Sequence, residues 1–244
     1  MSEVKKLKDA LYPLKKWLQS LFIYLPLKWR SAGYDHYWRH RKLTAQTPLN
    51  SFQRKRADLV LRYIKENSSV LDIGAGNGRV LLYVDGNKPL SKMIAADISK
   101  DALEMARENG IQTIEVDISK METFKDIPAT DYIFMFEILE HIPNSEEMLE
   151  WAVLRARKGV FFSVPNTGFI FHRLRLLFGR FPLQWRLSPS EHLRFWTLRD
   201  MKWWLRESGY KTFEPHTYEG VPLLNNIWPG LFAEGLFVYI PKIG

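Results

Sequence analysis

The segment Val70–Gly78, which reads Val-Leu-Asp-Ile-Gly-Ala-Gly-Asn-Gly, decides the fold. Its apolar beginning follows two serines and predicts a buried parallel strand that ends at Ile73. The three glycines that follow allow a tight turn and a close approach of the backbone to a ligand. From Arg79 onward the sequence predicts a helix, and the unpaired N–H groups of its first turn would point towards that ligand.

The spacing of the glycines distinguishes two kinds of nucleotide site. A dinucleotide loop has the pattern G-x-G-x-x-G below a pyrophosphate, but here the third glycine comes one residue early and Arg79 stands in its place. The pattern G-x-G-x-G after an acidic residue resembles motif I of the class I S-adenosylmethionine (SAM) methyltransferases. An ordinary strand–turn–helix without a ligand is the alternative. The resemblance implies a SAM site that contains Asp72, Gly74, Ala75, Gly76 and Gly78.

Two further predicted strands end at carboxylates. Residues 92–97 end in Asp97, where an acid can accept both hydroxyls of a ribose, although a surface turn would also accommodate it. Residues 111–116 are followed by Asp117, at the place where an acid of class I methyltransferases reaches the adenine amino group and an apolar neighbour packs on the ring. The carboxyl ends of such strands share the ligand-binding edge of an open α/β sheet. The resemblance thus adds Asp97, Ile98, Asp117 and Ile118 to the SAM site.

The fourth predicted strand, residues 131–136, runs into the segment 137–143, Glu-Ile-Leu-Glu-His-Ile-Pro. This segment resembles the one that follows strand four in methyltransferases of small molecules, where its first residue, Glu137, flanks the methionine end of SAM. It lacks the Asn-Pro-Pro-Tyr-like pattern of enzymes that methylate amino groups of DNA and proteins, which counts against a nucleobase amine as acceptor. We read His141 as a structural histidine, with a catalytic base as the less favoured alternative.

Residues 167–190 form a long excursion after the fifth predicted strand. They carry aromatic residues and arginines but no acidic residue, and long excursions in compact domains are usually functional. The resemblance places substrate-covering insertions here, while a lid that merely packs on the body is the alternative. Several stretches of the second half resemble the MetW-like branch of the family, also called methyltransferase type 11: Ser163–Asn166, Arg173–Gly179, Glu191–Leu193 and Thr197–Asp200.

The resemblance extends from about residue 50 to the end and implies an α/β, Rossmann-like fold. The expected sheet has seven mostly parallel strands in the order 3-2-1-4-5-7-6, with helices on both faces. The sixth and seventh strands are expected at 210–218 and 235–240, and residues 222–233 as an apolar loop. An amphipathic helix over 51–66 should precede the first strand. The expected domains are an N-terminal arm, 1–45, and a methyltransferase domain, 46–244.

Composition narrows the chemistry. The 244 residues are 46% hydrophobic, enough for one α/β domain with a sizeable core, and include no cysteine. A disulfide framework, a cysteine-ligated metal and a cysteine nucleophile are therefore excluded. Of the net charge of +8, residues 1–42 carry +7, which leaves 25 basic and 24 acidic residues in the rest of the chain. The nearly neutral body makes a nucleic-acid substrate the weakest of the functions considered.

The N-terminal arm is basic and amphipathic. Over residues 4–25 leucines recur at helical spacing between lysines, and Pro26 should end the helix. Its longest uncharged run, Trp17 to Leu27, has eleven residues, whereas a membrane span needs roughly 20. The pattern favours a segment, residues 4–30, that lies on an anionic membrane surface, so we expect a cytoplasmic protein peripheral to the inner face of the membrane. A helix that packs on the body or on a partner is the alternative.

The expected reaction is displacement of the SAM methyl group onto an oxygen or a carbon, with S-adenosylhomocysteine as the product. Positioning supplies most of the catalysis, and a hydroxyl acceptor also needs a base, for which His192 beside Glu191 is the candidate. Both residues could instead anchor the insertion. No metal-ligand spacing is apparent, so we expect metal-free chemistry. The expected acceptor is an apolar, lipid-linked or glycan-type small molecule, and the alternative is a MetW-like SAM-binding partner of an acyltransferase in methionine biosynthesis.

Overall fold

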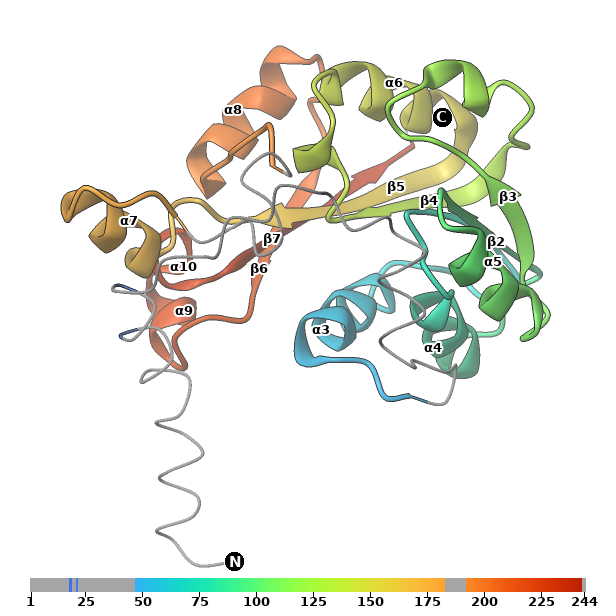
Figure 1. Cartoon of the computed structure of the whole chain (residues 1–244), viewed down its shortest axis with the longest axis horizontal. Coiled ribbons are helices and arrows are strands. Elements are labelled where there is room, and N and C mark those ends of the chain that lie inside the picture. Colours follow the sequence, from blue (N-terminus) through green and yellow to red (C-terminus); the bar gives the residue numbers. More distant parts are fainter. Residues whose placement is uncertain (1–17, 19–20, 22–46, 183–191, 243–244) are drawn as a thin grey trace, which may run out of the picture.

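A seven-stranded sheet forms the centre of the computed structural model, which describes residues 18, 21, 47–182 and 192–242. The strands follow the order β3-β2-β1-β4-β5-β7-β6, as predicted (Figure 1). Strand β7 runs antiparallel to its neighbours β5 and β6, and the other pairs are parallel. The strands are β1 Ser69–Ile73, β2 Lys92–Asp97, β3 Gln112–Glu115, β4 Thr130–Phe136, β5 Ala156–Pro165, β6 Glu214–Tyr218 and β7 Gly235–Pro241.

Helices cover both faces of the sheet. In Figure 1, α3, α4 and α5 lie on one side and α6 and α8 on the other, while α7, α9 and α10 gather at the end of the sheet where β6 and β7 lie. The α-helices are α3 Ser51–Val60, α4 Arg79–Asn87, α5 Lys100–Arg107, α6 Ser145–Arg155, α7 Ile170–Leu177, α8 Leu198–Glu207, α9 Leu224–Ile227 and α10 Pro229–Phe232. Two short 3₁₀ helices are η1 Met121–Phe124 and η2 Leu139–His141.

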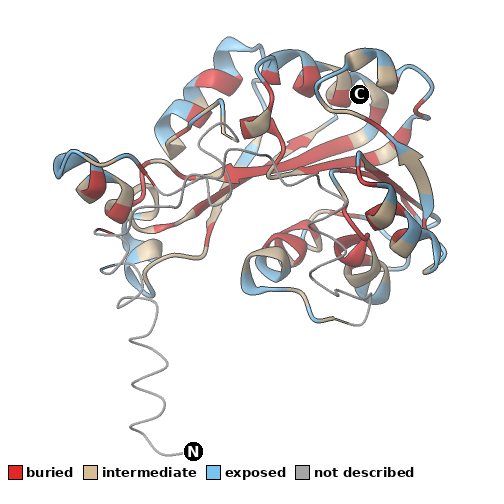
Figure 2. Cartoon of the chain, in the orientation of Figure 1, coloured by how far each residue is buried: buried red, intermediate tan, exposed pale blue. Residues whose placement is uncertain are grey.

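The core has two layers because the central strands are buried on both faces (Figure 2). All five residues of β1 are buried, and side chains that alternate along it enter different clusters. Leu71 and Ile73 pack with α6 and α8, whereas Val70 packs with α3, α4 and α5. This continuous apolar pattern is typical of a parallel strand with helices above and below it.

Local capping explains several helix boundaries. Ser99 accepts a hydrogen bond from Ala102 N and begins α5, as predicted, and Gly110 follows that helix with φ +77°. Helix α3 begins with a capping box in which Asn50 and Gln53 bond to each other's backbone N–H. It ends at Val60, not at residue 66, because Tyr63 and Ile64 both donate to the Val60 carbonyl and close a tight turn.

Two other expectations were wrong. Strand β6 begins at Glu214, not at Tyr210, because the Tyr210 N–H bonds to the carbonyl of Leu205 and closes the end of α8. The expected loop over 222–233 contains the one-turn helices α9 and α10, with Pro229 at the first position of α10, where its missing N–H costs nothing.

No helix among the described residues combines the length and the apolarity needed to cross a bilayer. The N-terminal arm lies outside those residues except for positions 18 and 21, and Glu191 and residues 183–190 of the insertion lie outside them too.

Candidate functional site

The glycine loop joins β1 to α4 at the carboxyl edge of the sheet. Its glycines all have positive φ, at +73° for Gly74, +55° for Gly76 and +74° for Gly78. A Cβ on Gly74 would come 2.2 Å from Cδ1 of Ile138, so the loop passes directly against the segment after β4. The backbone of Gly74 is held by a 2.7 Å hydrogen bond to the carbonyl of Ala96 on β2. Position 74 needs a positive φ and leaves no room for a Cβ, and only glycine meets both requirements.

Asp97 reaches the glycine loop from the end of β2. Its Oδ2 accepts a 2.7 Å hydrogen bond from Gly76 N, and its Oδ1 accepts one of 2.9 Å from Ser99 N. The half-buried carboxylate thus joins the ends of β1 and β2, and its expected contact with a ribose stays a prediction. The next residue, Ile98, is 43% exposed, although it is a large apolar side chain beside a polar loop.

Asp72 is a buried carboxyl at the end of β1, with 3% of its surface exposed. Burial, and secondarily the nearby Asp97 carboxylate, raises the pKa of Asp72 to about 8, although Arg56 acts in the opposite direction. The free carboxyl is therefore mostly protonated at neutral pH. A cation bound beside it would favour the ionised form.

Glu137 stands directly after β4 and is the centre of a polar network that the sequence did not reveal. Its Oε1 accepts hydrogen bonds from Ser163 (2.8 Å) and Tyr218 (3.0 Å) and pairs with Arg56 Nη1 at 3.0 Å. None of the three contacts Oε2, and the side chain is 32% exposed. Glu137 also has φ +57°, a conformation that costs free energy in a residue with a side chain and is concentrated at functional sites.

Arg56 is the buried partner of this network, with 8% of its surface exposed. Burial acts to lower the pKa of Arg56, but the nearby Tyr218 and Glu137 raise this pKa by more than burial lowers it. The guanidinium therefore stays charged. Burial and Glu137 raise the pKa of Tyr218, so the hydroxyl stays neutral. It donates a hydrogen bond to Glu137. A signal for Arg56 exists in the sequence, because it shares the apolar face of α3 with Phe52 and Val60 at helical spacing.

Asp117 contacts its own loop after β3. Its Oδ1 accepts hydrogen bonds from the backbone N and the hydroxyl of Ser119, at 3.0 and 2.6 Å, and its Oδ2 pairs with Lys120 at 3.1 Å. The Ser119 hydrogen bonds lower the pKa of Asp117. Ile118 is half-buried beside it. If the Asp117 carboxylate contacts a ligand, it must do so while it also holds its hydrogen bonds from Ser119 and its ion pair with Lys120.

Glu140, His141 and His192 meet on one side of the segment after β4. The main-chain oxygen of Glu140 accepts hydrogen bonds from Leu193 N (2.7 Å) and Arg194 N (3.2 Å), which hold the segment that follows the insertion against η2. The rings of His141 and His192 lie edge to face, with their centroids 4.7 Å apart. Burial, and then His141, lowers the pKa of His192 to about 4. The spatial group was not visible in the sequence, because one member is far along the chain from the other two.

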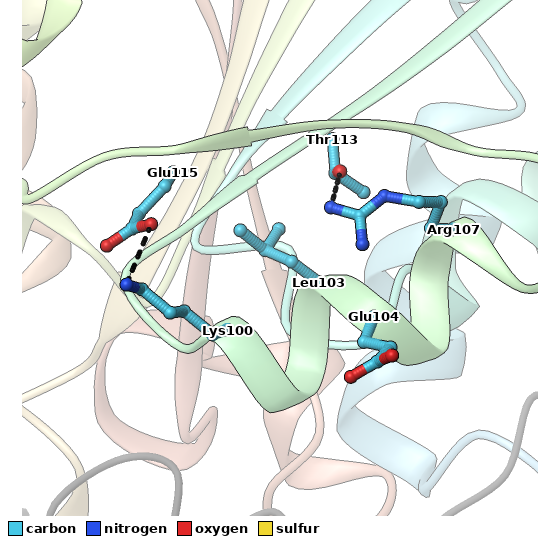
Figure 3. Close-up of a pocket in the computed structure, with 6 residues that line it drawn as sticks. All are labelled: Lys100, Leu103, Glu104, Arg107, Thr113 and Glu115. Carbon is cyan, nitrogen blue, oxygen red and sulfur yellow. Dashed lines mark hydrogen bonds and ion pairs between the residues drawn. The ribbon is translucent and has the colours of Figure 1, made fainter.

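A surface hollow of about 280 Å³ lies elsewhere, between α5 and β3 (Figure 3). The Lys100–Glu115 ion pair, with an N–O distance of 3.6 Å and both side chains largely exposed, spans one end, and Arg107 donates to Thr113 at 2.7 Å. Its lining contains none of the residues predicted to bind SAM: it consists of Lys100, Leu103, Glu104, Arg107, Thr113 and Glu115.

The carboxyl edge of the sheet fits SAM in its chemistry. Asp97 presents a half-buried carboxylate of the kind that accepts hydrogen bonds from a ribose diol, and the exposed Ile98 is an apolar side chain of the kind that packs on an adenine ring. Glu137 offers a carboxylate oxygen, and Asp72 a titratable carboxyl, for the ammonium of the methionine end. The glycine loop lets the ligand approach the backbone between them.

Comparisons with known proteins agree with this chemistry. The family model for a methyltransferase domain matches residues 37–214. The chain is 32% identical over 112 residues to a release factor glutamine methyltransferase of Streptococcus pneumoniae, a match that covers 45% of this chain and 40% of that protein. It is 27% identical over 161 residues to the bifunctional methionine biosynthesis protein MetXA/MetW of Rhodopirellula baltica, which covers 59% of this chain and 25% of that protein. The chain thus spans less than half the length of these curated relatives.

The fold is shared with solved structures as well. A SAM-dependent methyltransferase of Thermotoga maritima superposes with a TM-score of 0.55 at 15% identity, over 86% of this chain and 94% of that chain. At this low identity, the structural similarity shows a shared fold only. The family itself is shown by the family model, which matches well over half of the chain. The motif, the sheet order and the family match therefore agree that this chain belongs to the SAM-dependent methyltransferases.

Proposed function

We propose that this enzyme transfers the SAM methyl group to an oxygen, or a carbon, of an apolar, lipid-linked or glycan-type small molecule at a membrane surface. The observation that carries the proposal is an exposed apolar surface at one end of the sheet. Eight of the fourteen exposed large hydrophobic side chains among the described residues belong to α7, α9 and the residues next to them. They are Leu176, Leu177, Phe178, Phe181, Leu223, Leu224, Ile227 and Trp228, and we call them the apolar surface.

The two parts of the apolar surface are far apart in the sequence but lie at the same end of the sheet. In Figure 1, α7 lies beside α9 and α10 at the end of the sheet, and the last residues of α7 are exposed in Figure 2. Beneath it, Phe169 and Phe171 pack with Val221, just before α9. Exposed apolar patches of this kind mark interaction sites for membranes, proteins or ligands.

One described residue of the N-terminal arm, Leu21, packs at the same end of the molecule. Leu21 is 7% exposed and packs with Phe169 and Phe171, and its carbonyl accepts a 2.7 Å hydrogen bond from Arg180. Leu21 therefore lies next to residues that adjoin the apolar surface. Basic charge beside exposed apolar side chains favours an anionic membrane over an apolar protein partner.

A hydroxyl acceptor must lose its proton during transfer. His192 is the candidate base from the sequence, and in the structure it is neutral at physiological pH because its pKa is lowered to about 4. A neutral imidazole can accept a proton, but a base with so low a pKa gives a small driving force. Glu191, its proposed partner, lies outside the described residues.

Vesicle sedimentation tests the membrane part of the proposal. We expect the full chain to bind vesicles of anionic phospholipid, and the double substitution Leu177→Ser/Ile227→Ser to weaken binding by about tenfold or more, because two exposed apolar side chains no longer enter the lipid. Leu154→Ser/Trp203→Ser is the matched control, since these residues are similarly exposed but lie on α6 and α8. Equal losses in both variants would contradict a specific role for the apolar surface.

The acceptor is sought with SAM that carries a labelled methyl group. Incubation with a total membrane lipid extract should place label in the organic phase, and the Asp97→Ala variant should not. Label that appears only in protein or in water-soluble metabolites would refute an apolar acceptor.

A second candidate function follows from the similarity to the MetXA/MetW protein. The chain could serve as a SAM-binding partner of an acyltransferase, with the same site and little turnover. Size-exclusion chromatography with the acyltransferase from the same organism tests this. A stable complex, together with no labelled product from lipid or metabolite extracts, would favour the partner role over the enzyme role.

A further inference from the structure

The cluster of Glu140, His141 and His192 has the composition of a cation site. Each residue offers one ligand atom, a carboxylate oxygen or an imidazole nitrogen, and these atoms all lie within 4.8 Å of one another. The backbone fixes this arrangement, because the two N–H groups that follow His192 both donate to the Glu140 carbonyl. The cluster is therefore built by the fold and does not depend on the placement of flexible surface side chains.

Glu140 is the unusual member of the cluster. It is 1% exposed, and neither of its carboxylate oxygens accepts a hydrogen bond from another residue. Among the described residues, the nearest positively ionisable atom is Nε2 of His141, at 3.9 Å from Oε1. Nδ1 of His192 is also buried and has no hydrogen-bond partner. Buried polar atoms in native proteins are nearly always paired, so a group that pairs with both is expected.

No other residue that the structure describes is hydrogen-bonded to these atoms. The nearby guanidinium of Arg56 is bound to Glu137 and Tyr218 instead. One carboxylate with two imidazoles is a known ligand set for catalytic Zn²⁺, which keeps one position open, and for other divalent transition metals. Ligand atoms that share one tetrahedral ion lie about 3.3–3.6 Å apart, so side-chain shifts of up to about 1 Å would close the cluster around the ion.

We propose that Glu140, His141 and His192 bind one divalent cation of the Zn²⁺ class, and that the open position of this cation holds the acceptor oxygen. The second part rests on the proposed methyl transfer to a hydroxyl. The bound hydroxyl would release its proton to solvent, and the O–CH₃ bond would form as the S–CH₃ bond breaks and its electron pair returns to sulfur. His192 then acts as a ligand and not as the base. This departs from the metal-free chemistry expected from sequence spacing.

Calorimetric titration of Zn²⁺ into the chelator-treated full chain tests the proposal. We expect one ion per chain with a dissociation constant in the micromolar range or below, and binding at least about tenfold weaker in Glu140→Gln and in His192→Ala. His172→Ala is the matched control, because Nδ1 of His172 is likewise buried without a partner but lies outside the cluster. It should bind Zn²⁺ as the wild type does. Mg²⁺, which prefers oxygen ligands, should bind far more weakly.

No Zn²⁺ binding by the folded wild type, or equal binding by the wild type and His192→Ala, would overturn the site. Glu140 would then be held as a neutral acid. S-adenosylhomocysteine binding, measured on the same samples, separates failure of the cation site from failure of the proposed enzyme function. If the wild type binds Zn²⁺ but not S-adenosylhomocysteine, methyl transfer is refuted and the cation site remains. If it binds S-adenosylhomocysteine but not Zn²⁺, only the cation site is refuted. Binding of S-adenosylhomocysteine by each variant also confirms that the variant is folded.

Discussion

Ligand binding should be linked to the ionisation of Asp72. Its pKa is about 8 in the free chain because the carboxyl is buried and faces Asp97. At pH 6 about 1% of such a group is ionised and at pH 8 about half. If the ammonium of S-adenosylhomocysteine binds beside the ionised form, the apparent association constant rises roughly 50-fold between pH 6 and pH 8. In the absence of ligand, the ionisation of Asp72 has the opposite effect on folding. The free energy of unfolding falls as the pH rises from about 4 towards 8, because the folded chain holds the Asp72 proton more tightly than the unfolded chain does.

Isothermal titration calorimetry at pH 6, 7 and 8 measures this linkage directly. Repeating the titration at pH 7 in two buffers with different ionisation enthalpies should show release of nearly one proton. In Asp72→Asn, which keeps the size of the side chain, we expect an affinity that changes by less than about threefold over the same range. A flat profile for the wild type would refute the reasoning, and so would an equally steep profile for Asp72→Asn, which would place the titrating group elsewhere.

Two further substitutions test the packing around the site by denaturant unfolding. Gly74→Ala should lower stability by about 2–4 kcal/mol, because the added Cβ meets Ile138 at 2.2 Å and alanine is disfavoured at φ +73°, whereas Gly86→Ala, in open space within α4, should be neutral or slightly stabilising. Arg56→Ala should cost about 3 kcal/mol, because it leaves the Glu137 carboxylate without its cation. A loss below about 1 kcal/mol in Arg56→Ala would show that the Ser163 and Tyr218 hydroxyls suffice.

The sequence predicted the parts of the fold that depend on local pattern. The run at 92–97 became β2 with the predicted bounds, and the glycine loop stands where its spacing placed it. Boundaries failed where a main-chain hydrogen bond overrode the side-chain pattern. Tyr210 looks like the start of a strand, but its N–H already closes the end of α8. The helical turns of α9 and α10 were missed because segments of four residues carry no periodicity.

In the candidate site too, residues with a local sequence signal could be predicted, and contacts between distant parts of the chain could not. The position of Asp97 at the end of β2 could be predicted because a strand that ends in an acid is a local signal, whereas its hydrogen bond from Gly76 N was not predicted. The network around Glu137 could not, since Arg56 and Tyr218 are brought together from helix α3 and strand β6. A buried arginine on an apolar helix face is a sign that some distant acid must pair with it, but the sequence does not name that acid.

The central claim is that the loop between β1 and α4, together with Asp97, binds SAM, and calorimetric titration of S-adenosylhomocysteine tests it most directly. We expect micromolar binding to the wild type and at least about tenfold weaker binding to Asp97→Ala, because a charged acceptor for two ribose hydroxyls and the anchor of Gly76 N are both lost. A folded wild type that gives no heat over several temperatures, or an Asp97→Ala variant with unchanged affinity, would contradict the account.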